Sequence, residues 1–219
     1  MKVNVKILIL TLHFALLIFN LMLPLEARAG ILISRSISSS YLTNGLVGYW
    51  TMDGNKVNWA TGAVTDSSGF GNTGTITNMA TSTGVSSGKL GQALNFDGVD
   101  DSINIANTIS NIQTVGFWVK ATTTKKLIDL NGTASIEVIN GTITANNFTA
   151  TIYVDGIAAS TIDTNWHYVT VTTGTGISGS AITIGKIGTG FLNGILDDVR
   201  IYNRALSAKE VHQLYLIGK

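Results

Sequence analysis

The sequence contains no cysteine, which excludes disulfide bonds, thiol catalysis, thiolate metal sites and lipid attachment to an N-terminal cysteine. Its single proline is Pro24, so the long remainder suits strands joined by glycine-containing turns. Beyond residue 29 only two glutamates occur, Glu137 and Glu210. No run of basic residues indicates binding to nucleic acid or to an anionic membrane. A domain of this composition depends for its stability on its core or on a bound metal.

Residues 1–29 have the pattern of a secretory signal peptide. Two lysines precede the apolar run 7–23, and a small-residue cleavage pattern ending at Ala29 follows Pro24. The alternative is a retained signal anchor, because the run is close to spanning length. No second long apolar run follows. We therefore expect no membrane span after cleavage and a location that is secreted, extracellular, at the cell surface or periplasmic.

Residues 30–44 are serine-rich and are predicted to form an arm or linker, while residues 45–217 are predicted to form one domain. Short runs rich in valine, isoleucine, threonine and aromatic residues alternate with turn residues, which is typical of strands. Ten such runs lie at 46–52, 91–96, 102–106, 114–121, 125–130, 135–139, 149–155, 167–173, 181–186 and 194–203. The pattern predicts an all-β fold, an antiparallel two-sheet jelly-roll sandwich.

Local signals refine this architecture. Asn131-Gly132, Asn140-Gly141 and Asp155-Gly156 lie between strand-like runs and are typical of hairpin turns. Near the C-terminus, Ser207 and Glu210 have the spacing of a capping box. A short helix over about 207–216 is therefore expected after the last strand.

The stretch GILDDVRIYNRALS, residues 194–207, raises a specific question. Strict alternation places Asp197 in one row with Ile195, Val199 and Ile201, and places Asp198 with Arg200 on a solvent face. An unpaired carboxylate in an apolar row is costly to bury. Asp197 is therefore expected to have a partner.

Seven segments in order resemble the laminin-G-like jelly-roll domains of the concanavalin A-like lectin/glucanase superfamily, over about residues 45–217. They are GLVGYWTMDG, DSSGFGNTGTI, GKLGQALNFDGVDDSINI, GFWVKA, IYVDG, NWHYVTVT and FLNGILDDVRIYNRALSAKEVHQLY. The resemblance implies two packed antiparallel sheets with the first and last strands adjacent.

The resemblance also implies a structural calcium ion near the edge of the sandwich. Its ligands would fall on Asp53, Gly71, Asn72 and Asp197, with Asp66 as a further candidate. The residue types agree, because calcium takes carboxylate and carbonyl oxygens. The alternative is that Asp66 and Asn72 only form Asx turns and that Asp53 is an ordinary turn residue.

Catalysis is not expected. Glucanases of the superfamily use two carboxylates that face each other across the sugar bond, whereas Glu137 stands alone on its strand and Glu210 belongs to the capping box. The segment with Asp97, Asp100 and Asp101 is interpreted as a hairpin loop. His167 is interpreted as a strand residue, so the sequence predicts no enzyme.

Two functions remain. The first is a secreted, calcium-stabilised, lectin-like module that binds glycans or extracellular protein ligands. The second is a structural or adhesive surface protein without defined sugar recognition. Trp59, Phe70 and Phe191 lie in or beside loops and are the candidate ligand-binding aromatics, whereas Trp50, Trp118 and Trp166 are expected in the core. Clustering of the three loop aromatics in one patch would favour the first function.

Overall fold

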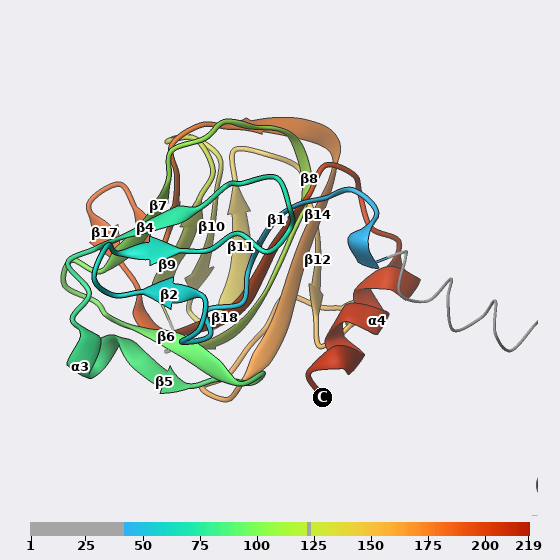
Figure 1. Cartoon of the computed structure of the whole chain (residues 1–219). Coiled ribbons are helices and arrows are strands. Elements are labelled where there is room, and N and C mark those ends of the chain that lie inside the picture. Colours follow the sequence, from blue (N-terminus) through green and yellow to red (C-terminus); the bar gives the residue numbers. More distant parts are fainter. Residues whose placement is uncertain (1–41, 122–123) are drawn as a thin grey trace, which may run out of the picture. The chain divides into compact units, whose positions relative to one another are not determined.

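The computed structural model describes residues 42–121 and 124–219. The predicted signal peptide 1–29 and most of the predicted arm 30–44 lie outside the described residues. Residues from Thr43 to Lys219 form one compact unit, which is the β-domain drawn in Figure 1. Among the described residues, no helix has the length and apolar character needed to cross a membrane.

The domain is a sandwich of two antiparallel sheets, which confirms the predicted fold class. The first sheet has the order β13-β12-β14-β8-β18-β6-β5, with β1 also paired to β18. Its strands are β1 (Leu46–Trp50), β5 (Val85–Ser87), β6 (Gln92–Asp97), β8 (Ile109–Ala121), β12 (Thr151–Val154), β13 (Ile157–Ala158), β14 (His167–Gly179) and β18 (Asn193–Tyr202).

The second sheet has the order β11-β10-β9-β15-β7-β4-β3-β2. Its strands are β2 (Val57–Asn58), β3 (Ala63–Val64), β4 (Gly74–Thr77), β7 (Ser102–Ile105), β9 (Lys125–Asp129), β10 (Ser135–Ile139), β11 (Thr142–Asn146) and β15 (Ile182–Ile184). A small hairpin of β16 (Lys186–Ile187) and β17 (Gly190–Phe191) lies against β9. All ten predicted runs contain strands, while β4, β5, β11 and the two-residue strands were not predicted because they are short or strongly polar.

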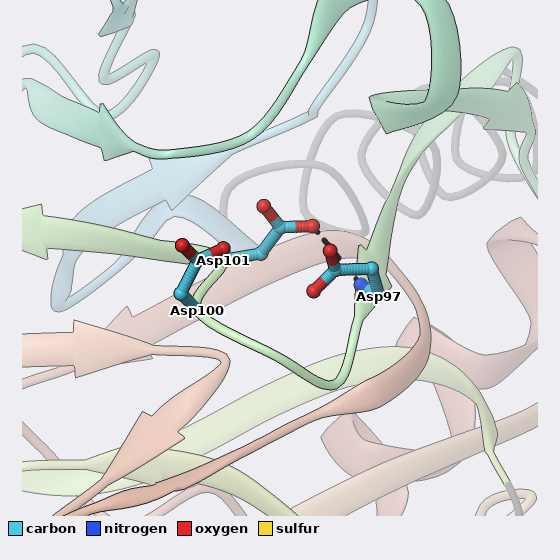
Figure 2. A group of neighbouring side chains, drawn as sticks. All are labelled: Asp97, Asp100 and Asp101. Carbon is cyan, nitrogen blue, oxygen red and sulfur yellow. Dashed lines mark hydrogen bonds between the residues drawn. The ribbon is translucent and has the colours of Figure 1, made fainter.

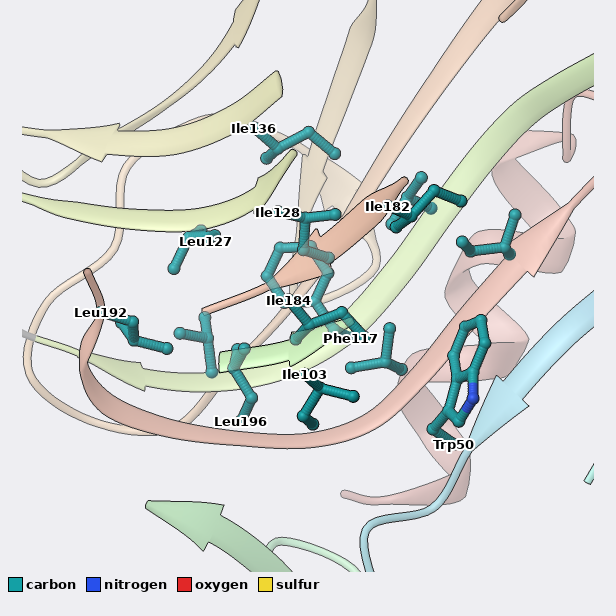
Figure 3. Close-up of a cluster of buried hydrophobic side chains, with 14 of the residues drawn as sticks. Trp50, Ile103, Phe117, Leu127, Ile128, Ile136, Ile182, Ile184, Leu192 and Leu196 are labelled. Atoms are coloured by element: carbon teal, nitrogen blue, oxygen red, sulfur yellow. The ribbon is translucent and has the colours of Figure 1, made fainter. Parts of the chain in front are cut away.

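Apolar side chains of the two sheets meet in one core (Figure 3). Phe117 and Leu196 come from the first sheet, and Ile128, Ile136 and Ile184 come from the second. Trp50 belongs to this core and is fully buried, as expected. Trp118 is also buried but lies outside the core, on the outer face of the first sheet beside Tyr168, 5.1 Å between ring centroids. Trp166, which was also expected in the core, is only half-buried and lies in the loop before β14.

The strand β18 connects the two chain ends of the domain. It pairs with β8 along one side, and on the other side it pairs first with β6 and then with β1. The first and last strands are therefore adjacent, as the resemblance implies. Asp197 lies at the place where the neighbour of β18 changes from β6 to β1.

A bulge at this place corrects the prediction made from strict alternation. The register of β18 against β8 shifts between Asp197 and Arg200, and Asp198 has a φ of 54°. As a result, Leu196 and Val199 both face the core, although they are three residues apart. Asp197 lies opposite Trp118 on the outer face instead of in the apolar row, because the extra residue of a bulge reverses the alternation.

The C-terminal helix α4 (Ala208–Ile217) confirms the predicted helix. Ser207 and Glu210 form the capping box, which satisfies amide groups at the start of the helix. The buried side chains Val211 and Leu214 dock the helix, and Tyr215 lies 5.8 Å from Trp118 between ring centroids. A second helix, α3 (Thr81–Gly84), was not predicted.

The three predicted turn dipeptides all join paired strands. Asn140-Gly141 and Asp155-Gly156 have positive φ at both residues, as a two-residue hairpin turn requires. Asn131-Gly132 instead belongs to a longer connection between β9 and β10. There the Asp129 carboxylate accepts hydrogen bonds from the amides of Asn131 and Gly132.

Candidate functional site

The carboxylate of Asp197 is buried beneath the loop Gly88–Gln92. Its Oδ2 atom accepts hydrogen bonds from the amides of Lys89 (2.9 Å) and Leu90 (2.8 Å). Its Oδ1 atom is buried and has no donor among the described residues. Because a buried oxygen without a partner is costly, this atom marks a place where a further group would be stabilising.

Asp53 lies at the other side of the same loop. Its Oδ1 atom accepts a hydrogen bond from the amide of Gln92 (3.0 Å), and the Gln92 side chain accepts one from the amide of Gly54 (2.8 Å). Glycine is required in the loop, because a Cβ at Gly88 would lie 2.7 Å from Asp197 Oδ2 and a Cβ at Gly91 would lie 2.4 Å from Asp53 Oδ1. The loop thus passes close to both carboxylates.

The two carboxylates also interact electrostatically. Burial raises the pKa of Asp197 to about 7, the hydrogen bond from Leu90 partly offsets this, and the negative charges of Asp198 and Asp53 raise the pKa further. A cation beside Asp197 Oδ1 would oppose the effects of burial and of these charges. The residues present therefore fit a bound cation at this junction.

Asp66 is held differently. It is buried, and its two carboxylate oxygens accept hydrogen bonds from the amides of Tyr49, Ser68 and Asn72 and from the Ser68 hydroxyl, at 2.8 to 2.9 Å. Four protein donors occupy this carboxylate, as in an Asx turn. None of these contacts links it to the Asp53–Asp197 junction.

Gly71 and Asn72 belong to the same arrangement as Asp66. The Asn72 side-chain amide donates to the carbonyl of Val47 (2.7 Å), and its backbone carbonyl accepts from Trp50 Nε1 (2.9 Å). Asn107 donates to the carbonyl of Gly71 and to Asn72 Oδ1, both at 3.2 Å. The structure therefore divides the candidate metal ligands into two groups: Asp53 with Asp197, and Asp66 with Gly71 and Asn72.

Asp198, the other acid of the pair in β18, is not on a solvent face as expected. It is buried and receives two hydrogen bonds from Arg200, from Nε at 3.1 Å and from Nη2 at 3.2 Å. Arg200 also donates to the Tyr49 hydroxyl (3.0 Å). Asp198 and Arg200 share one face of β18, as the alternation predicted, but both side chains are buried there instead of exposed to solvent.

A group of acids in the loop between β6 and β7 was not recognised as a candidate metal site from the sequence. The segment was predicted to be a hairpin loop, but β6 and β7 belong to different sheets, so the loop crosses from one sheet to the other. It brings carboxylate oxygens of Asp97, Asp100 and Asp101 within 4.8 Å of one another (Figure 2). Asp101 is buried and accepts a hydrogen bond from the Asp97 amide (3.0 Å). Burial raises the pKa of Asp101, and the charges of Asp97 and Asp100 add to this. The D-x-x-D-D spacing of these three residues is the sequence signal that could have identified them as a candidate metal site.

An open pocket of about 420 Å³ lies on the first sheet beside this loop. Cross-strand pairing of Ile195 with Asn95 and with Lys120 forms its floor, because these residues share one face of β6, β18 and β8. Thr164 comes from the loop before β14. The lining residues are Asn95, Lys120, Ala121, Thr164, Asn193, Gly194 and Ile195.

The candidate aromatics do not line this pocket. Trp59 packs against the core, Phe70 is 65% exposed in the Asp66–Asn72 loop, and Phe191 lies in β17 beneath the Lys186 ammonium group. No ring contact joins these three aromatics in the described chain. The structure therefore does not show the single aromatic patch that would have favoured sugar binding.

The two glutamates within the domain have structural partners. Glu137 is buried, forms an ion pair with Lys126 and accepts a hydrogen bond from Asn146 (2.8 Å). Glu210 forms an ion pair with Arg204 (2.7 Å) and belongs to the capping box. Neither glutamate has the free, facing carboxylate partner that glycoside hydrolysis uses.

Comparison with known proteins agrees with this geometry. A family model, Laminin_G_3, described as "Concanavalin A-like lectin/glucanases superfamily", matches residues 85–212, more than half of the chain. No curated protein matches the sequence.

Similar solved structures include domain 4 of an extracellular GH43 arabinanase from Geobacillus stearothermophilus, solved with arabinotriose. It is 18% identical, with a TM-score of 0.54, over 78% of this chain and 98% of that domain. The binding domain of Paraclostridial Mosquitocidal Protein 1 is 15% identical, with a TM-score of 0.55 over 80% of this chain and 52% of its own.

A structure of botulinum neurotoxin type C, whose cell entry depends on two ganglioside molecules, is also similar. It is 12% identical, with a TM-score of 0.54 over 83% of this chain and 53% of its own. The chain thus spans about half the length of the two toxin structures. At these identities, the similarity concerns the fold.

Proposed function

Because the chain belongs to the Laminin_G_3 family of the concanavalin A-like lectin/glucanases superfamily, we propose that it is a non-catalytic module that binds a glycan in the pocket at the start of β18. The pocket itself is the observation that carries this proposal. The amides of Asn95 and Asn193, the Thr164 hydroxyl and the Lys120 ammonium group supply donors and acceptors for sugar hydroxyl groups. Ile195 and Ala121 offer apolar surface for the C–H face of a sugar ring.

The similar solved structures support the class of ligand. The arabinanase domain was solved with an oligosaccharide, and the type C neurotoxin interacts with gangliosides. They also support a binding role without catalysis, because these neighbours are an accessory domain of an enzyme and binding domains of toxins. Export of the module outside the cytoplasm is part of the proposal and rests on the signal-peptide pattern of residues 1–29.

We also propose that Asp53 and Asp197 hold a structural calcium ion. The support is the buried, unpartnered Oδ1 atom of Asp197 and the nearby charge of Asp53. A bound calcium ion would neutralise these charges and link two segments that are distant in sequence. Asp66 is not included in this proposed pair, since protein donors already occupy its carboxylate.

A glycan array, run with calcium and with chelator, tests the binding function. We expect a defined group of glycans to bind in calcium, whereas a blank array under both conditions would overturn the proposal and favour the structural or adhesive function.

Lys120→Ala tests the place of binding. Lys120 is exposed and forms no ion pair with the described residues, so its loss removes charged hydrogen bonds to ligand without breaking a structural contact. We expect about tenfold weaker binding of the strongest array glycan, measured by titration calorimetry. Lys209→Ala, on the exposed face of α4, is the matched control. Equal affinity of both variants would place the glycan site elsewhere.

A further inference from the structure

The imidazole ring of His167 lies between two carboxylates at the start of β14. Its Nδ1 atom is 2.8 Å from Asp155 Oδ2, and its Nε2 atom is 3.0 Å from Asp163 Oδ1. Asp155 belongs to the β12–β13 turn, and Asp163 belongs to the loop that precedes β14. The ring therefore connects a hairpin turn to a loop without regular secondary structure.

The two carboxylates differ in how firmly they are held. Asp155 accepts a hydrogen bond from the Tyr168 amide at Oδ1 (3.0 Å), and its own amide donates to the Tyr168 carbonyl (2.8 Å). Asp163 is bound within its own loop, where it accepts hydrogen bonds from the Asn165 amide (2.7 Å) and side chain (3.0 Å). The contact with His167 thus links the side chain of Asp163 to β14, whereas the preceding residue is held at the β10–β11 turn by a hydrogen bond from the Ile162 amide to the Gly141 carbonyl (2.8 Å).

This loop supplies Thr164 to the pocket described above. The other lining residues lie on β6, β8 and β18, where strand pairing holds them. Thr164 has no such pairing and follows Asp163 directly. The position of the Thr164 side chain in the pocket wall therefore depends on how Asp163 is held.

The two contacts of His167 Nε2 with Asp163 are alternatives. When Nε2 carries a proton, it donates to Asp163 Oδ1 (3.0 Å); when it carries none, it can only accept, and the Asp163 amide lies 3.3 Å away. If the neutral ring keeps its proton on Nδ1, toward Asp155, loss of the Nε2 proton therefore moves the hydrogen bond from the side chain of Asp163 to its backbone. We propose that His167 is a positioning residue of the pocket, which sets the place of Thr164 through Asp163 and changes it when the ring loses its proton. This inference rests on the proposed glycan-binding function of the same pocket.

The charges around the ring favour the protonated form. Burial by itself lowers the pKa of His167, but hydrogen bonds and charges of Asp163 and Asp155 outweigh this and raise the pKa above its ordinary value. The residue opposite on β8 is the apolar Val119. On the α4 side, His212 packs against Gly156, the neighbour of Asp155.

The sign of the pH effect follows from the raised pKa. The bridge contributes fully to stability below the ordinary histidine pKa of 6.5, and its contribution is lost as the pH rises through the higher pKa of the folded state. Asp163 does not titrate in this interval, because the Asn165 amide, and then His167, lower its pKa to about 2. The change in the pocket is therefore expected on the alkaline side of pH 6.5.

The test uses the full chain without ligand, labelled for NMR, between pH 5 and pH 9. We expect the Thr164 amide signal and the His167 ring signals to follow one common midpoint above 6.5. In His167→Gln the pH dependence of Thr164 should disappear, and in Asp163→Asn the midpoint of His167 should fall, because one of the two negative charges is removed. His212→Gln, the matched control on α4, should keep the wild-type profile.

Arabinotriose serves as the probe of affinity. We expect binding by the wild-type chain to be about threefold to tenfold weaker above the midpoint than below it, as loss of one hydrogen bond implies, and binding by His167→Gln to be independent of pH. A Thr164 signal that does not follow His167, or that titrates unchanged in His167→Gln, overturns the positioning role. If Thr164 follows His167 and arabinotriose and the glycan array both show no binding, the positioning role stands and the glycan proposal fails.

Discussion

The loop Asp66–Asn72 and the loop Gly88–Gln92 each surround acids that were expected to hold calcium, but they differ in how completely they hydrogen-bond the carboxylate oxygens. In the first loop, four protein donors occupy the carboxylate of Asp66. In the second, the amides of Lys89 and Leu90 occupy only one oxygen of Asp197, and the other is buried without a donor among the described residues. The first loop completes its own hydrogen bonding, whereas the second leaves an oxygen for a cation.

The comparison shows that acids in a predicted ligand set are not equivalent. An acid whose oxygens are all occupied stabilises the fold through hydrogen bonds and gains little from a cation. An acid with a free, buried oxygen is destabilising until a cation or a proton arrives. Removal of calcium should therefore change the stability contributed by the second loop and leave that of the first loop unchanged.

Asp66→Ala should have the largest effect. It removes the acceptor of three backbone amides in a buried place, so we expect the free energy of unfolding to fall by about 3 kcal/mol. The loss should be the same in calcium and in chelator, measured by urea denaturation. A loss that depends on calcium would show that Asp66 belongs to the metal site and would remove the contrast between the loops.

Asp197→Asn should have an effect whose sign depends on calcium. In chelator, the neutral amide avoids a buried charge, and we expect the variant to be about 1–2 kcal/mol more stable than the wild type at pH 8. In calcium, the wild type should gain stability by mass action and the variant should not. Thermal melting of both proteins, with calcium and with chelator, measures the stability difference in chelator and the stabilisation by calcium. A variant that keeps the wild-type response to calcium would rule out Asp197 as a ligand.

Phe70→Ser should have the smallest effect. Its ring is 65% exposed at the tip of the first loop, so we expect a change within about 0.5 kcal/mol in either condition. Urea denaturation of this variant beside Asp66→Ala separates the loop tip from the carboxylate below it. A large loss would mean that the ring stabilises the loop, against the view that Asp66 alone holds it.

Much of the fold could be predicted from the sequence, because alternation and turn residues are local signals. The strands at 114–121 and 194–203 are recognisable from their valine, isoleucine and aromatic residues, and the helix is recognisable from Ser207 and Glu210. The bulge at Asp198 was not predictable in this way. Alternation assumes that successive residues always point to opposite faces, and a positive φ at a residue other than glycine is not evident from the residue type. This single extra residue reversed the predicted face of Asp197.

The candidate sites depended on contacts between residues that are distant in the sequence, which the local pattern of a single sequence does not show. Asp53 and Asp197 were paired only through the resemblance, and the separation of Asp66 from them arises from hydrogen bonds to Tyr49 and Asn72. The pocket depends on the register of Ile195 against Asn95 and Lys120. His167 was interpreted as an ordinary strand residue because its two carboxylate partners come from separate turns.

The place of β18 between β8, β6 and β1 has a consequence for the order of synthesis. The strand made last among those of the sheet is also the one to which three earlier strands pair. Until residue 202 is available, β1 and β6 lack this partner, and contacts between such distant segments form slowly. A growing chain therefore cannot complete the pairing of its first sheet before residue 202 has been made. The first and last strands of the domain can therefore join only after every other strand of this sheet has been made.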